Sequence, residues 1–150
     1  MELKIYFFVS TIFTAIECFV EALRVRERFL GPDNEKVGDT LHNMGLVLKN
    51  MRRYDEAVNQ YEKALRVRKL KPGESNTKAA DTLYNMAIVY ANSGRYSSAL
   101  EKYKEALRTY QEIGLEDNHP SMINTLQWIK WADKQIKIQL AENKIEVVKS

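Results

Sequence analysis

The sequence predicts an all-α fold, a right-handed α-solenoid of antiparallel helix pairs that ends in a long capping helix. Two observations lead to this prediction. The chain has 150 residues with only 6 Gly and 3 Pro, which is too little turn material for a β-sandwich or a barrel. A pattern of residues also recurs at a spacing of 42, and a period of this length is typical of stacked helix pairs.

The repeat is clearest in two pairs of segments. Residues 39–44 read Asp-Thr-Leu-His-Asn-Met and residues 81–86 read Asp-Thr-Leu-Tyr-Asn-Met, an offset of 81 − 39 = 42. At the same offset, residues 22–26 and 64–68 are identical, Ala-Leu-Arg-Val-Arg. We therefore expect a single domain built from a partial repeat (1–30), two repeats (31–72 and 73–114) and a capping helix (115–150).

The first element, residues 1–30, is predicted to be the second helix of an incomplete repeat, because Ala15, Phe19 and Ala22 fall on the register of the later second helices. The 12 uncharged residues of the run 5–16 are too few to span a membrane, which needs about 20. Their number also suits the core of a secretory signal, so a signal peptide over residues 1–16 stays open as an alternative. An incomplete repeat leaves an apolar edge, through which the chain could self-associate.

The next element, residues 31–72, reads as two helices. The first runs from about 37 to 50, with Leu41, Met44 and Leu48 on one face at three- and four-residue steps. After a break at 50–53, the second begins with Asp55 as its predicted N-cap. Gly45 is small enough to let the two helices approach closely.

The element 73–114 repeats this plan. Ala87 takes the place of the small residue, and Gly94 suits the left-handed end of a helix because it has no Cβ. Ser97 is the predicted N-cap of the second helix, and Tyr103 fills the space toward the next unit.

The last element, residues 115–150, departs from the repeat because Lys130 stands where Gly45 and Ala87 stand. Apolar residues at multiples of three or four nevertheless predict one long amphipathic helix. They are Met122, Leu126, Ile129, Ile136, Leu140 and Val147. A capping helix with a polar outer face is the first interpretation. A coiled-coil or partner-binding extension beyond Leu140 is the alternative.

The small residue in each first helix, the aromatic that opens each second helix and the Ala…Tyr…Ala spacing resemble tetratricopeptide (TPR) repeats. The period of 42, longer than the basic period of about 34, and the Thr-Leu-x-Asn-Met blocks resemble the kinesin light chain subclass. This resemblance implies a protein–protein interaction scaffold whose first helices line a concave groove for a peptide, in this subclass a cargo-adaptor segment. Asp39, His42 and Leu46 stand where a chaperone-tail clamp would need cations and amides, so that kind of partner is not expected.

The candidate groove residues lie on the first helices, opposite the face that packs on the second helix. They are Asp39, His42, Asn43, Leu46, Lys49, Asn50, Asp81, Tyr84, Asn85, Ile88, Asn92 and Trp128. Asn43 and Asn85 are the strongest candidates, because an amide can donate to and accept from a peptide backbone at the same time. Leu46 and Ile88 are expected to supply apolar pockets, and Trp128 either extends this wall or is buried in the cap.

No sequence motif predicts catalysis, a metal or a cofactor: phosphate-binding glycine loops, zinc-protease motifs and nucleophile elbows are all missing. Cys18 is expected to pack inside a repeat. The net charge of +3 and tyrosines in core register argue against nucleic-acid binding, and the basic clusters at 24–28 and 66–71 are expected to favour helix C-termini. A cytoplasmic, non-enzymatic protein that binds a protein or peptide partner is the resulting expectation.

Overall fold

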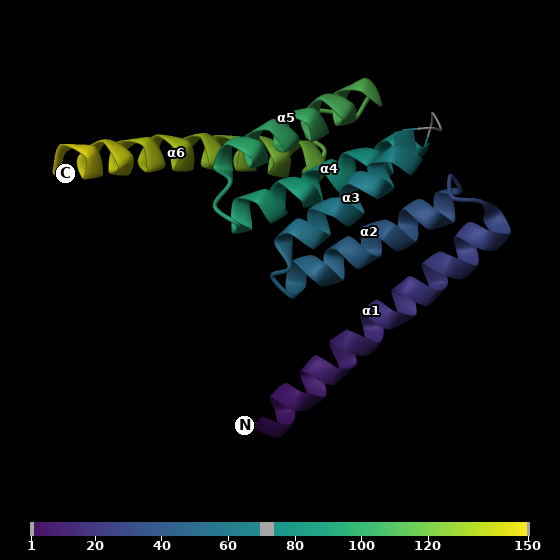
Figure 1. Cartoon of the computed structure of the whole chain (residues 1–150). Helices are drawn as coiled ribbons and strands as arrows, with labels where there is room; N and C mark the ends of the chain where they lie inside the picture. Colours follow the sequence, from purple (N-terminus) through teal and green to yellow (C-terminus); the bar gives the residue numbers. More distant parts are fainter. Residues whose placement is uncertain (1, 70–73, 150) are drawn as a thin grey trace. The chain divides into compact units, whose positions relative to one another are not determined.

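The computed structural model describes the backbone of residues 2–69 and 74–149, and the side chains of residues 14–69 and 76–147. All secondary structure within these ranges is α-helical (Figure 1). The helices are α1 (Glu2–Leu30), α2 (Glu35–Asn50), α3 (Tyr54–Lys69), α4 (Glu74–Asn92), α5 (Tyr96–Glu112) and α6 (Pro120–Lys149). The predicted all-α class is confirmed.

The chain forms two compact units, Met1–Ser75 and Asn76–Ser150. The first unit contains α1, α2 and α3, and the second contains almost all of α4 together with α5 and α6. The division falls close to the expected boundary between the repeats at 72 and 73. That the 150 residues form a single domain stays a prediction.

In the first unit α2 and α3 form an antiparallel pair, and glycine at two positions of α2 permits their close approach. A Cβ placed on Gly45 would lie only 2.6 Å from Cε1 of Tyr61, and one on Gly38 would lie 3.3 Å from Val67. The prediction that Gly45 permits a close approach is therefore confirmed. A small apolar core forms between the two helices, and Leu23 of α1 packs against it. The core residues are Val37, Leu41, Ala64 and Val67.

α1 is fastened to α2 by polar contacts as well. The Arg26 guanidinium donates to the Lys36 carbonyl oxygen at 3.1 Å and to the Thr40 hydroxyl. The chain reverses at Gly31, whose positive φ of 85° suits glycine. Asn34 then caps α2, since its side-chain oxygen accepts from the Lys36 N–H at 3.0 Å.

The second helices begin one residue before the positions that the sequence predicted. α3 starts at Tyr54 and α5 at Tyr96, so Asp55 and Ser97 lie inside the first turn and the prediction that they are N-caps was wrong. Backbone hydrogen bonds of the turn determine where these helices begin. The Ala57 N–H donates to the Arg53 carbonyl oxygen at 3.0 Å, and Arg95, the residue before α5, makes no side-chain capping hydrogen bond.

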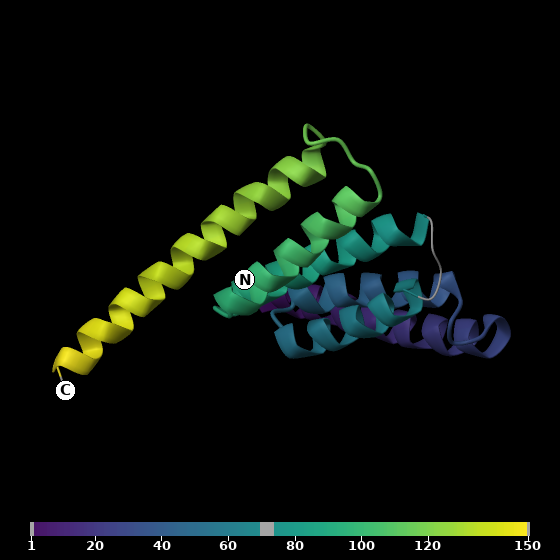
Figure 2. The same ribbon diagram turned by 90° about the horizontal axis from the view of Figure 1, so that it is seen from above.

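In the second unit a core of small residues surrounds one tyrosine. Its buried members are Ala87, Ala91, Ala99, Tyr103 and Ala132, from α4, α5 and α6. α6 continues beyond the helices on which it packs (Figure 2), and its outer end is exposed, with Leu140 at 56%. The prediction of one long C-terminal helix is confirmed.

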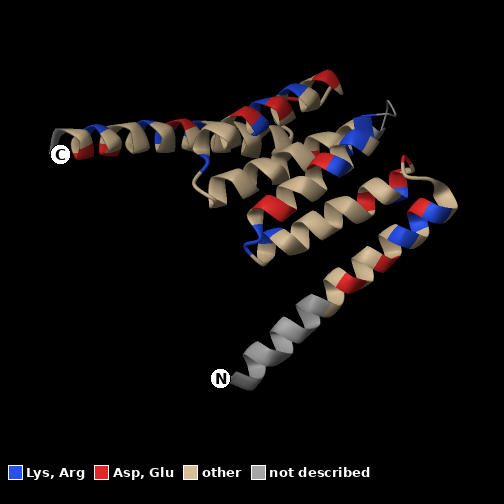
Figure 3. Ribbon diagram, in the orientation of Figure 1, with Lys and Arg blue, Asp and Glu red and all other residues tan. Residues whose placement is uncertain are grey.

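Basic residues lie near the C-terminal ends of α1 and α3 in the first unit (Figure 3). Arg28 lies in the last turn of α1, and Arg66 and Lys69 lie in the last turn of α3, where cations oppose the negative end of the helix dipole. Within the described residues, none of the helices has the length and apolar character needed to cross a bilayer. The side chains of residues 1–13 lie outside the described part. The alternative of a signal peptide over residues 1–16 therefore concerns mostly side chains that the structure does not describe.

Candidate functional site: the first-helix faces

The predicted site residues lie on three helices. Six are on α2 in the first unit, five are on α4 in the second unit, and Trp128 is on α6.

A buried threonine fixes the register of each of these helices. Thr40, Thr82 and Thr125 have at most 1% of their surface exposed. Each hydroxyl donates to the carbonyl oxygen four residues earlier, at 2.7, 2.7 and 2.6 Å, which satisfies the polar group inside the packed layer. Since the residue three positions after each threonine occupies the same place, Trp128 on α6 corresponds to Asn43 and Asn85.

On α2 two of the predicted residues are bound to the neighbouring second helix. Arg68 of α3 is only 4% exposed, and its Nη2 donates to Asp39 Oδ1 at 3.0 Å. Its Nη1 lies 3.2 Å from Nδ1 of His42. A guanidinium has no acceptor, so Nδ1 of His42 is the acceptor in this contact. Asp39 and His42 therefore hold α2 and α3 together in addition to lining the face.

The other residues of the α2 face are more accessible. Asn43 and Asn50 are exposed, whereas Leu46 and Lys49 are half-buried. Burial lowers the pKa of the Lys49 ammonium. This face is polar, and Leu46 offers less apolar surface than an exposed side chain would.

On α4 the same connection to the second helix recurs with a different residue type. Asp81, 42 positions after Asp39, accepts a 2.6 Å hydrogen bond from the hydroxyl of Tyr110, which is 42 positions after Arg68. Burial, and next the hydrogen bond to Asp81, raises the pKa of Tyr110. The repeat thus keeps a carboxylate at this place and changes its partner from a cation to a neutral donor.

Asn85 is half-buried one turn further along α4. Its Nδ2 donates to the Asp81 carbonyl oxygen at 2.9 Å. This bond orients the amide and uses one of its two hydrogens. The second hydrogen and the side-chain oxygen keep their capacity for a ligand. Asn92, at the end of α4, is exposed.

Aromatic rings from all three helices of the second unit contact one another. Tyr84 contacts Tyr103 edge to face at 5.6 Å, Tyr103 is stacked with Trp128 at 6.3 Å, and Trp128 meets Trp131 at 5.3 Å. Trp128 is nevertheless 39% exposed, so its ring is partly packed against these aromatic rings and partly accessible. Ile88 packs against the same core, half-buried. Burial raises the pKa of Tyr84, and a hydrogen bond from Trp128 opposes this effect.

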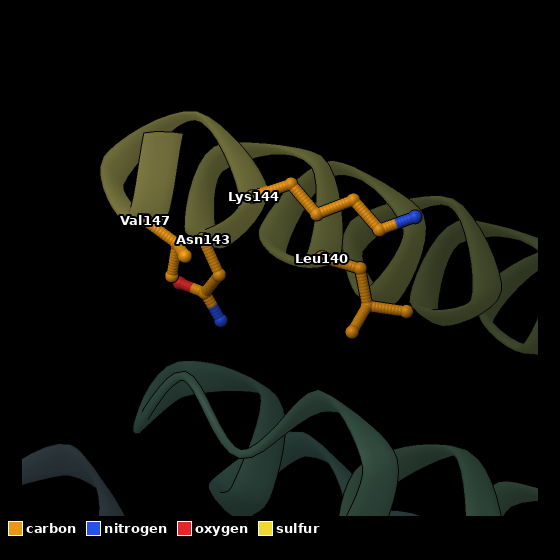
Figure 4. A pocket seen from close by; sticks show the side chains of 4 residues that line it. All are labelled: Leu140, Asn143, Lys144 and Val147. Carbon is orange, nitrogen blue, oxygen red and sulfur yellow. The ribbon is translucent and has the colours of Figure 1, made fainter. Parts of the chain in front are cut away.

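A separate surface hollow lies near the end of α6, away from these residues (Figure 4). All the side chains that line it come from this one helix, and they are Leu140, Asn143, Lys144 and Val147. Within the described residues, no group of three or more His, Cys, Asp or Glu side chains could hold a metal ion.

Two residues important to these faces were missed in the sequence. Arg68 was assigned with other basic residues to a helix end, and Tyr110 was not considered. The signal was present, because the offset of 42 that relates Asp39 to Asp81 also relates Arg68 to Tyr110. Cys18, expected to pack inside a repeat, is exposed, and that prediction was wrong.

Comparison with solved structures shows the same fold. Two crystal structures of a kinesin light chain from Podospora anserina with nearly identical TPR-like repeats match with TM-scores of 0.70 and 0.69, both at 16% identity. They cover 96% and 93% of this chain and 68% and 66% of their own chains. The crystal structure of BtubC (BKLC) from P. vanneervenii matches with a TM-score of 0.65 at 17% identity, covering 89% of this chain and 59% of its own. This chain therefore spans about two thirds of the length of these relatives, and the predicted α-solenoid is confirmed.

No curated protein matches the chain. The family model for the tetratricopeptide repeat matches residues 5–70 and 38–112, which together cover well over half of the sequence. The solved structures that resemble this chain have TPR-like repeats of the kinesin light chain type. The chain belongs to the tetratricopeptide repeat family.

Proposed function

We propose that this protein is a non-enzymatic scaffold that binds an extended segment of a partner protein on the faces of its first helices. TPR repeats generally mediate protein interactions, which supports the class of function. The likeness to kinesin light chain repeats suggests that the partner segment belongs to a cargo adaptor. On this proposal the protein acts in the cytoplasm and needs no cofactor.

The observation that carries the proposal is the arrangement around Asn85. Its amide is held by the Asp81 carbonyl and can still donate to and accept from a ligand backbone. A side chain that is already oriented loses little conformational freedom on binding. Asn85 therefore suits recognition of a peptide main chain, whatever the side chains of that peptide are.

Trp128 adds an apolar anchor at the equivalent place on α6. One side of its indole is supported by Tyr103, and Trp131 contacts it from another helical turn. The exposed remainder can cover an apolar or aromatic side chain of the ligand. Rigid aromatic groups of this kind contribute a large share of the binding energy at protein interfaces.

The α2 face supports a second, more polar contact through Asn43. Its amide is exposed, and the half-buried ammonium of Lys49 lies along the same helix. We expect this face to contribute less than the α4 and α6 residues, because it lacks an aromatic anchor.

The test is to select peptides from a displayed random library with the full chain and to measure their affinity by calorimetry. Asn85→Ala removes a hydrogen-bonding group and should weaken binding by about 1–3 kcal/mol, or roughly 5- to 150-fold in Kd. Trp128→Ala should weaken it at least as much. Asn59→Ala is the matched control, since Asn59 is an exposed asparagine on the second helix α3, and its affinity should equal that of the wild type. Failure to select any peptide, or full affinity of a folded Asn85→Ala variant, would refute the proposal.

A further inference from the structure

α1 carries an apolar stripe of which three residues are exposed in the described part of the chain. The stripe residues recur at alternating steps of three and four, and they are Ala15, Cys18, Ala22, Val25 and Phe29. Val25 is 40% exposed and Phe29 is 75% exposed, and Cys18 is exposed as well, whereas Ala15 and Ala22 are half-buried. α2 packs on a different side of α1, through Leu23 and Arg26.

The repeat shows what such a stripe normally contacts. Forty-two positions later, Ala57, Ala64 and Val67 of α3 stand in the places of Ala15, Ala22 and Val25, with at most 2% of their surface exposed. The place of Cys18 is taken by the half-buried Gln60, so the correspondence covers the middle of the stripe. Val67 lies against Gly38 of the first helix α2, and Ala64 shares its core. The stripe of α1 is therefore the surface that, in a complete repeat, packs against a first helix.

The chain does not fold back to supply that helix where the repeat would do so. The turn at 51–53 corresponds to residues 9–11, and these lie inside the continuous helix Glu2–Leu30. The helix that covers the stripe must come from another molecule or from another part of a longer protein.

We infer that two copies of this chain pair through their α1 stripes in antiparallel orientation. This places Cys18 opposite Phe29 of the second copy and Ala22 opposite Val25 of the second copy, each twice by symmetry. Each of these facing pairs forms one layer of the interface, and every layer combines a small residue with a larger one, which fills space evenly. The same patch is used on both copies, so the contact closes as a two-fold dimer.

Charge favours this orientation. On the flank of the stripe that faces away from α2, Glu21 comes next to Arg28 of the second copy, and Arg28 comes next to Glu21 of the second copy. Glu21 also pairs with Arg24 of its own helix at 2.7 Å, and both residues are exposed, so the carboxylate can be shared between the two cations. In the parallel orientation Glu21 would instead face Arg26, whose guanidinium is already bonded to Lys36 and Thr40 on α2. Parallel pairing would also stack Phe29 on Phe29 and Ala22 on Ala22, which crowds one layer and leaves a gap in another.

The dimer is independent of peptide binding, because its residues lie on α1 and none of the proposed peptide contacts does. Its consequence would be a bivalent scaffold, which raises the avidity for a partner with two binding segments.

The first experiment is sedimentation velocity of the full chain over a range of concentrations. We expect a monomer–dimer equilibrium that Val25→Glu shifts to the monomer, with Kd raised about a hundredfold by burial of an unpaired charge. Val20→Glu is the matched control: Val20 is 50% exposed and lies about half a helical turn from both Cys18 and Ala22. Far-UV circular dichroism verifies that both variants keep their helices. A wild-type chain that stays monomeric at every concentration overturns the inference, as does equal loss of dimer in the two variants.

The second experiment reverses charges and does not depend on the apolar layers. Glu21→Arg alone and Arg28→Glu alone should each weaken self-association, whereas a mixture of the two variants should form a heterodimer with both pairs restored. Cys18 reports the orientation, because antiparallel pairing separates the two Cys18 residues by about 11 residues, or roughly 16 Å along the helix. Rapid formation of a Cys18 disulfide under mild oxidation, or failure of the mixed variants to associate, would contradict the antiparallel dimer.

Discussion

Replacing Asp39 by alanine should destabilise the first unit, because it removes the carboxylate that faces a buried guanidinium. Arg68 is 4% exposed and donates to Asp39 Oδ1 at 3.0 Å. Without Asp39, Arg68 loses the carboxylate that lies 3.0 Å from its Nη2 while its side chain stays buried.

The magnitude follows from the exposure of the two partners. Removing one member of a buried ion pair costs about 3–5 kcal/mol. The Asp39 side chain is 36% exposed, so water screens the pair and the expected loss is about 2 kcal/mol. The reverse change, Arg68→Met, fills the same space with an apolar chain and leaves Asp39 in contact with water. It should cost about 1 kcal/mol or less.

Urea unfolding followed by far-UV circular dichroism measures both variants by linear extrapolation. For a chain of this size a loss of 2 kcal/mol corresponds to a decrease in Tm of about 4–8 °C. Asp81→Ala is the matched control in the second unit, where the partner is the neutral hydroxyl of Tyr110. It should cost about 1–2 kcal/mol, the value for a buried hydroxyl left without its acceptor.

The asymmetry between the two partners is the decisive outcome. If Arg68→Met destabilises the protein as much as Asp39→Ala does, the reasoning from a buried guanidinium is wrong. An Asp39→Ala variant within about 0.5 kcal/mol of the wild type would refute it equally.

Four further substitutions test individual features of the packing and the turns. Arg52 has a positive φ of 59°, so Arg52→Gly should raise the free energy of unfolding by about 0.5–1 kcal/mol. Gly94→Ala at the equivalent turn, where φ is 74°, should lower the free energy of unfolding by about 1 kcal/mol. Urea unfolding compares the two variants, and a loss of stability on Arg52→Gly would contradict the expectation. The buried hydroxyl of Tyr103 has no hydrogen-bond partner among the described residues, so Tyr103→Phe should leave Tm unchanged or raise it, and a loss above about 1 kcal/mol would show an overlooked partner. Gly45→Val should cost at least about 2 kcal/mol because its Cβ would lie 2.6 Å from the Tyr61 ring, and a calorimetric Tm equal to that of the wild type would show that the helices can move apart.

The helix pairs were predictable because their packing depends on residue size at fixed positions. Gly45 lies over the ring of Tyr61, and the Ala87 and Tyr103 pair recurs 42 positions later within one core. Since the period of the repeat is long, each such contact is seen twice in the sequence. Chance similarity is therefore an improbable explanation for the pattern.

The starts of the second helices were not predictable from capping residues. The turn closes through backbone hydrogen bonds such as Arg95 N–H to the Tyr90 carbonyl at 2.9 Å, and the helix then begins without a side-chain cap. Asp55 and Ser97 have the residue types of N-caps and lie one residue inside the helix. Asp55 still favours the positive end of the helix dipole from this place.

The candidate faces could be predicted only in part. The register predicts that Asn43, Asn85 and Trp128 occupy equivalent positions on their helices, because helical periodicity determines which residues share a face; that they contact a ligand stays a prediction. It does not reveal that Arg68 turns inward toward Asp39, since a basic residue near a helix end is usually exposed. It also does not reveal that Ile88 and Leu46, expected as exposed pockets, are half-buried, because this depends on neighbouring side chains.

The most direct test of the central claim is an NMR titration of the ¹⁵N-labelled full chain with a library-selected peptide. The protein has 2 Trp, so the indole N–H signals of Trp128 and Trp131 are easily followed beside the side-chain amides of Asn85 and Asn59. Binding on the first-helix faces predicts saturable shifts at Trp128 and Asn85 and an unchanged signal for Asn59 on α3. Shifts confined to Asn59 and the outer end of α6, with Trp128 and Asn85 unaffected, would contradict it.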